Sequence, residues 1–158
     1  MEDFVILAQQ SRKEFTTADH LTYMTYPLVK DPKLIISIIE TLNVALTNAM
    51  NALLLYDQQY KRVQQKLPDG FEARFHIFRS VSAPFHNIEK EVVKQIPHLR
   101  ELLRTHKESI VEFVRKQKVI ICNDGYTRLK TITIEEVKEY IQVCKPLFAY
   151  MEKISHAH

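Results

Sequence analysis

Apolar residues follow helical rather than alternating patterns along most of the chain. The strongest pattern runs from Leu34 to Tyr56, where 16 of 23 residues are apolar and neither glycine nor proline occurs. Apolar positions surround this segment on all sides, which is typical of a helix buried against several neighbours. Asp31 and Pro32 precede it as an expected N-cap and first-turn residue. We therefore predict a long central helix over about residues 32–62.

Helical segments before and after the central helix supply its neighbours. We expect a first helix over residues 2–14 and a second one from Thr16, which Pro27 ends or kinks. Downstream, three phenylalanines recur at i, i+4 and i+7 on one helical face and are predicted to be core residues: Phe71, Phe75 and Phe78.

The second half of the chain continues with amphipathic helices. Ser82 is expected to cap a helix that runs to Ile96, where Pro97 introduces a kink or a new start. From Pro97 to Lys116, apolar residues form one face and charged residues the other. His106 falls on the apolar face, where we expect a partly buried histidine satisfied by one hydrogen bond.

The segment before the last helix has a different character. Residues 119–122 are Val-Ile-Ile-Cys, and Asn-Asp-Gly follows, so we predict a small β-hairpin near 118–132. Thr133 and Glu136 have capping-box spacing and open a C-terminal helix over about 134–154. The predicted fold is all-α: one domain, residues 1–158, in which an antiparallel helical bundle surrounds the central helix.

Composition narrows the function classes. The chain contains two glycines, which argues against phosphate-cradling glycine loops. Its two cysteines, Cys122 and Cys144, lie 22 positions apart and form no zinc-binding pattern. The chain starts with an acidic segment and has no apolar run of about 18 residues, so we expect neither a secretory signal nor a membrane span. We therefore expect a cytoplasmic protein.

Charge is concentrated in the middle of the chain. Residues 60–118 contain 13 Lys/Arg and 7 Asp/Glu, a balance of +6, whereas the remainder contains 9 and 12, a balance of −3. A basic segment can attract a phosphate backbone, although lysine-rich helix faces also serve solubility alone. The residues predicted to bind nucleic acid are Arg74, Lys90, Lys94, Arg100, Arg104 and Lys107.

Patterns for metal, cofactor or nucleophilic chemistry are missing from the sequence. Seven histidines occur, but no HExxH motif and no pair of Glu-x-x-His motifs accompanies them. No GxSxG element is present, and neither cysteine has a histidine partner nearby in sequence. We therefore expect no metal and no cofactor.

One constellation does suit phosphate chemistry. Arg79 and His86 are separated by six residues within the basic middle, and His76 lies one helical turn before Arg79. RNA cleavage without a metal needs a proton acceptor, a proton donor and a cation that stabilises the charged phosphorus centre. Histidine suits proton transfer near neutral pH, and the arginine fork suits phosphate oxygens. These three residues are the candidate catalytic group.

The spacing Arg79-x6-His86 resembles the Arg-x4–6-His motif of HEPN-domain proteins, and the helical layout over residues 30–120 is also similar. The resemblance implies a small helical bundle that acts as a metal-independent endoribonuclease, with its site formed across a dimer. It also implies a second option, because members without catalytic activity act as binding modules.

Three functions therefore stay open on the sequence, one of which is a nucleic-acid binder without catalysis that uses the basic residues of segment 60–118. Another is a non-catalytic helical interaction or assembly module, HEPN-like and RNA-associated, with a second copy or another protein as partner. The small residues Ala45, Ala49 and Ala52 on the central helix favour this option, because they allow helices to approach closely. The alternative is a HEPN-like endoribonuclease that uses Arg79 and His86.

Overall fold

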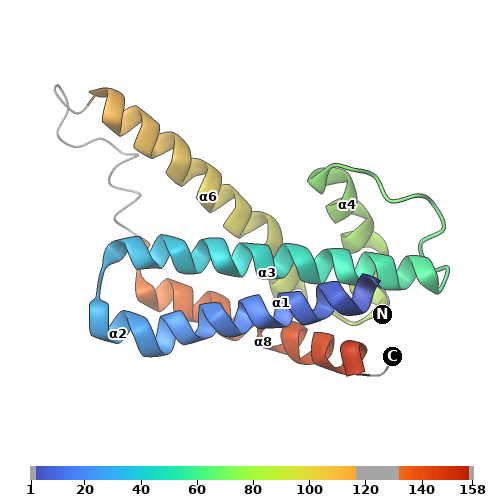
Figure 1. Cartoon of the computed structure of the whole chain (residues 1–158). Helices are drawn as coiled ribbons and strands as arrows, with labels where there is room; N and C mark the ends of the chain where they lie inside the picture. Colours follow the sequence, from blue (N-terminus) through green and yellow to red (C-terminus); the bar gives the residue numbers. More distant parts are fainter. Residues whose placement is uncertain (1–2, 117–131, 157–158) are drawn as a thin grey trace.

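The computed structural model describes residues 3–116 and 132–156, and for residues 108–116 it describes the helical backbone alone (Figure 1). The described part is all-α. The predicted hairpin near 118–132 falls almost entirely outside the described residues; Ile132 and Thr133, which precede the last helix, are not in a strand.

The central helix is present as α3, Pro32–Gln59 (Figure 1). Its start is as predicted, because the Asp31 side chain accepts a hydrogen bond from the Lys33 N–H at 3.0 Å and Pro32 occupies the first turn. Ile38, Leu42 and Leu46 are completely buried, as expected for a helix with neighbours on several sides.

The N-terminal helix is longer than predicted. Helix α1, Asp3–His20, continues without a break through Thr16, so the restart at that position was wrong. Phe15 stacks on Phe148 with ring centroids 4.3 Å apart, and Ala18 is fully buried. Packing of these residues holds the segment helical where the local capping signal suggested an end.

A widened turn follows α1. It is the π-helical turn η1, Leu21–Thr25, and the short helix α2, Tyr26–Val29, comes next with Pro27 in its first turn. Lys30 adopts a left-handed conformation, with φ of 53°, and ends the helix. Helix α1 and helix α3 then run antiparallel, side by side (Figure 1). Helix α2 thus ends two residues after the proline, at Val29, and not at the proline itself.

The middle of the chain repeats the order of α1, η1 and α2, in which a helix leads into a π-helical turn and then into a short helix. Helix α4, Phe71–Ile77, leads into a second π-helical turn, η2, Phe78–Ser82, and then into the short helix α5, Ala83–Phe85. A proline ring clashes with the carbonyl four residues earlier in an α-helix. For Pro27 and Pro84 those carbonyls belong to Tyr23 and Ser80, and both lie inside a widened turn. Ser82 makes no capping hydrogen bond, so its predicted role as a cap was wrong.

Two long helices complete the bundle. Helix α6, Lys90–Lys116, passes through Pro97 without ending, and its far half diverges from α3 (Figure 1). Helix α8, Ile134–His156, packs against α1, α3 and α6. Its N-cap is as predicted, since the Glu136 N–H donates to Thr133 Oγ1 at 3.2 Å.

Length and apolar composition would allow α3 to cross a membrane, a test that core helices also pass. In this fold 56% of its most apolar window is buried against the other helices. Of the three predicted core phenylalanines, Phe75 and Phe78 are buried and Phe71 is half-buried.

Candidate functional site

His86 is the candidate residue with the most developed surroundings. Its side chain is 1% exposed, and both ring nitrogens are engaged. Nε2 lies 2.8 Å from Asp57 Oδ1, and Nδ1 lies 2.5 Å from the Tyr150 hydroxyl. The three residues come from the end of α3, the end of α5 and the middle of α8, so this buried cluster ties three parts of the bundle together.

Two helix C-termini position the Asp57–His86 pair. At the end of α3, Lys61 is left-handed, with φ of 62°, and the Arg62 N–H donates to the Asp57 carbonyl at 2.7 Å. At the end of α5, Asn87 is left-handed, with φ of 55°, and the Ile88 N–H donates to the Ala83 carbonyl at 2.9 Å. Both turns are Schellman motifs.

These two motifs leave the partners close together. In the first motif, the Asp57 carbonyl accepts the hydrogen bond from the Arg62 N–H, so the Asp57 side chain lies at the end of the helix. His86 is the last residue before the left-handed Asn87. The backbone therefore fixes the positions of both side chains before they bond to each other.

Arg62 completes the charge balance of the buried cluster. Its Nε donates to Asp57 Oδ1 at 2.8 Å, and its guanidinium lies 4.1 Å from the centre of the Phe85 ring. Burial raises the pKa of Asp57, but the hydrogen bonds from His86 and Arg62, together with the nearby Ser82 hydroxyl, outweigh it and hold that pKa below its ordinary value. Asp57 is therefore ionised near neutral pH.

Ser82 supports the carboxylate more weakly than the other two residues. It lies near enough to Asp57 to lower its pKa, yet no hydrogen bond of normal geometry joins them among the described residues. Asp57 Oδ2 and Ser82 Oγ are both buried without such a bond. The close polar contacts of Asp57 thus converge on one oxygen, Oδ1.

The protonation pattern of the buried cluster follows from this charge. An ionised Asp57 only accepts hydrogen bonds, so His86 carries a hydrogen on Nε2. In a neutral imidazole Nδ1 then accepts the Tyr150 O–H. Burial, with Tyr56 and Asp57 nearby, raises the pKa of Tyr150, so its phenol stays protonated. The hydrogen-bond chain therefore runs from the Tyr150 hydroxyl through the His86 ring to Asp57 Oδ1.

The other two candidate catalytic residues lie apart from this cluster. Arg79 is exposed on η2, with its guanidinium 5.6 Å from the centre of the Phe75 ring. His76 is exposed on α4, and its carbonyl accepts the Ser80 hydroxyl. Within residues 3–116 and 132–156, no hydrogen bond or ion pair links Arg79 to His86. The arginine that reaches the buried cluster is Arg62.

Cys144 is a buried thiol, and the described histidines form no metal-binding group. Cys144 is fully buried, and burial raises the pKa of its thiol to about 12, so it stays protonated. Among the described residues, no group of three His, Cys, Asp or Glu side chains could hold a metal ion.

The residues predicted to bind nucleic acid separate into two groups. Arg74 is used internally, since its Nε donates to the Pro68 carbonyl and its Nη1 donates to Asn51 Oδ1 at 3.1 Å. The remaining five are exposed along α6: Lys90, Lys94, Arg100, Arg104 and Lys107. Between Lys90 and Lys107, the acidic residues of the sequence are Glu91 and Glu101. This stretch spans about 25 Å of helix.

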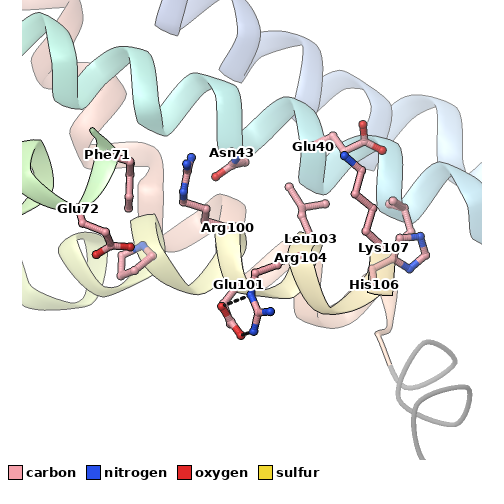
Figure 2. Close-up of a pocket in the computed structure, with 12 residues that line it drawn as sticks. Glu40, Asn43, Phe71, Glu72, Arg100, Glu101, Leu103, Arg104, His106 and Lys107 are labelled. Carbon is pink, nitrogen blue, oxygen red and sulfur yellow. Dashed lines mark hydrogen bonds and ion pairs between the residues drawn. The ribbon is translucent and has the colours of Figure 1, made fainter. Parts of the chain in front are cut away.

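A groove lies beside this basic face, between α3, α4 and α6, with a volume of about 690 Å³ (Figure 2). The Arg100 guanidinium lies 4.0 Å from the centre of the Phe71 ring on one wall. Glu101 and Arg104 pair with each other at the rim, where Arg104 Nε donates to Glu101 Oε2 at 3.0 Å. Ile36 and Leu103 add apolar surface.

Two polar atoms in the groove lack partners. Asn43 Oδ1 and His106 Nδ1 are buried, and neither has a hydrogen bond within the part of the chain that the structure describes. Burial lowers the pKa of His106 and Glu40 opposes this effect, so the imidazole is neutral near pH 7. His106 is partly buried, as predicted, and within the described residues Nδ1 does not make its predicted hydrogen bond.

Sequence reasoning identified His86 but missed its partners. Asp57 and Tyr150 lie 29 and 64 positions away from it. A signal for Asp57 was present, because it is the only acidic residue between Glu40 and Asp69 and it lies near the end of a largely apolar helix.

Family models, curated proteins and solved structures were all compared with this chain, and none of them matches it.

Proposed function

We propose that this chain is a non-catalytic helical binding module that associates with RNA through the exposed cations of α6. The observation that carries the proposal is the row of five exposed Lys/Arg side chains from Lys90 to Lys107, opposed by two glutamates. A linear row of cations suits the phosphate backbone of a nucleic acid, and association then releases counterions.

The state of His86 supports a role without catalysis. A general base must reach its substrate, whereas this imidazole is 1% exposed and already bonded through both nitrogens. The HEPN-like endoribonuclease remains the alternative. It requires Arg79 and His86 to act on one phosphate, with a second copy completing the site.

Salt dependence of RNA binding tests the proposal. We expect a labelled single-stranded RNA to bind with an affinity that falls steeply between about 50 and 200 mM salt. The log–log slope should approach about −3.5 if all five cations neutralise phosphates, at about −0.7 for each phosphate. Fluorescence anisotropy measures both the affinity and the slope. A flat salt response, or no binding at low salt, contradicts the proposal.

Charge-reversed variants locate the surface. Lys90→Glu, Lys94→Glu and Lys107→Glu together should abolish measurable binding. The matched control places the same three charge changes on exposed lysines of α1 and α8, as Lys13→Glu, Lys145→Glu and Lys153→Glu. The control should lose much less affinity, because its charges lie outside the α6 face.

A cleavage assay distinguishes the endoribonuclease from the proposed non-catalytic binding module. The purified protein should leave a labelled RNA intact both with and without EDTA. Cleavage that His86→Ala abolishes, in a variant whose fold circular dichroism shows to be intact, would support the endoribonuclease instead.

Self-association is a second element of the proposal. Met24, Leu28 and Val29 expose 60%, 87% and 58% of their surface at the corner between α1 and α3. Adjacent large apolar side chains at such exposure favour contact with a second copy of the chain. Light scattering should show a dimer at micromolar concentration, and Leu28→Glu should convert it to a monomer.

A further inference from the structure

The lining of the groove carries opposite charges in equal number. Three carboxylates and three cations line it together with the neutral His106: Glu40, Glu72, Glu101, Arg100, Arg104 and Lys107. The groove therefore offers no net positive charge to a phosphate, whereas Lys90 and Lys94 continue the cations of α6 beyond it. A polyanion on this surface would keep its backbone along α6 rather than inside the groove.

The walls of the groove suit a flat, uncharged group. The Arg100 guanidinium lies over the Phe71 ring, 4.0 Å from its centre, so the ring supports the guanidinium from one side. We call this stacked pair the Arg100–Phe71 layer. Figure 2 shows Arg100 beside Phe71 in the groove, with Asn43 of α3 further along it. Nucleic-acid bases stack on aromatic rings and on guanidinium planes because every base has a π-face.

Two residues that line the groove carry polar atoms without partners. Asn43 Oδ1 and His106 Nδ1 are buried without hydrogen bonds among the described residues, which is an unfavourable state for polar atoms. Both atoms are covered by neighbouring side chains, so the edge of a base would reach either of them once that side chain rotates towards the groove. The edge of a base offers donors and acceptors side by side. The volume of about 690 Å³ lies in the ordinary range for small-molecule sites.

We infer that the groove between α3, α4 and α6 takes one unstacked base of a single-stranded RNA, stacked on the Arg100–Phe71 layer, while the cations of α6 hold the flanking phosphates. This inference rests on the proposed RNA association and adds a base-specific contact to it. A duplex cannot make this contact without opening a base pair.

The test compares two oligomers with the same number of phosphates: a single-stranded oligoadenylate and an abasic ribose-phosphate oligomer. The wild-type protein should bind the oligoadenylate about fivefold more tightly or better, as expected for one stacked base. Arg100→Lys keeps the charge but removes the planar surface. This variant should bring the affinity ratio close to one and leave the salt slope unchanged.

Two further variants complete the design. Phe71→Leu should lower the ratio in the same way, since it removes the aromatic part of the layer. Arg104→Lys is the matched control at the rim, and it should retain the wild-type ratio. Because Phe71 is half-buried, Arg100→Lys decides the outcome if Phe71→Leu fails to fold.

The outcomes separate the two proposals. If the wild type binds both oligomers equally, or if Arg100→Lys keeps the full preference, the base site is wrong and the basic RNA-binding surface stands. If neither oligomer binds at low salt, the RNA association is wrong, and the base site is wrong with it.

Discussion

The buried cluster and the groove differ in whether their buried polar side chains are hydrogen-bonded. In the buried cluster, Asp57, His86 and Tyr150 bond to one another, and Arg62 joins them from the following loop. In the groove, Asn43 and His106 present buried polar atoms without partners in the described structure. The first region therefore uses its hydrogen bonds to join parts of the fold, whereas the second leaves hydrogen-bonding capacity unused within the described structure.

Removing Asp57 should give the largest effect of those that test this comparison. Asp57→Ala leaves His86 and Arg62 without their common acceptor, and breaking a buried pair in this way costs about 3–5 kcal/mol of stability. Urea unfolding measures the loss. Asp69→Ala, at an exposed position in the following loop, is the control and should change stability little. An equally small loss for Asp57→Ala would contradict a stabilising role for the buried cluster.

Acid should weaken the buried cluster before it weakens the groove. The folded-state pKa of Asp57 lies below its unfolded value of about 3.9, so ionised Asp57 stabilises the fold above that pH. The contribution is lost as the pH falls through the folded-state pKa. Unfolding free energies measured from pH 6 down to the acid transition should therefore fall below about pH 4.

The variant Asp57→Asn tests whether this one carboxylate is responsible. Its unfolding free energy should depend less on pH below about 4 than that of the wild type. If the two proteins show parallel acid profiles, other carboxylates cause the acid sensitivity.

The Tyr150 hydroxyl should make a smaller contribution than Asp57. Tyr150→Phe removes the hydrogen bond to His86 Nδ1 and should cost about 1 kcal/mol. A double-mutant cycle with His86→Ala provides the check. Tyr150→Phe should cost much less in that background, because the partner of the hydroxyl is already missing. Full additivity would show that the two groups do not interact.

Substitution in the groove should have the smallest effect on stability. Asn43→Leu replaces an amide whose buried Oδ1 has no partner among the described residues with an apolar side chain of similar size, so we expect no loss and a gain of up to about 1 kcal/mol. The same variant should bind oligoadenylate less tightly than the wild type. A loss of stability comparable to that of Tyr150→Phe would mean that the groove, too, serves the fold.

Sequence patterns predicted the parts of the fold that depend on local signals. The central helix, its Asp31 cap and the Thr133 cap of the last helix follow from residues adjacent in sequence. The predicted end of the first helix at residue 14 was wrong, because contacts such as that of Phe15 with Phe148 override the local capping signal at Thr16. The predicted hairpin is not tested, since it falls almost wholly outside the described residues.

The candidate site was predictable only in part. His86 and the cations of α6 stand out in the sequence by type and spacing. The choice between Arg62 and Arg79 as the arginine near the carboxylate depends on how helix ends meet in space, and no spacing rule encodes it. The sequence placed Arg74 among the cations predicted to bind nucleic acid, yet its guanidinium donates hydrogen bonds to Asn51 Oδ1 and to the Pro68 carbonyl.

The widened turn η2 has a consequence for how this chain tolerates deletions. A π-helical turn contains one residue more than an α-helical turn would use, and successive α-helical residues are about 100° apart around the axis. Deleting one residue from Phe78–Ser82 would restore ordinary winding without breaking the helix. Because the widened turn accommodates the extra residue, the side chains beyond it would keep nearly the same phase, and His86 would still face Asp57. A deletion within the α-helical part of α4, Phe71–Ile77, would instead rotate everything that follows by about 100° and separate His86 from Asp57.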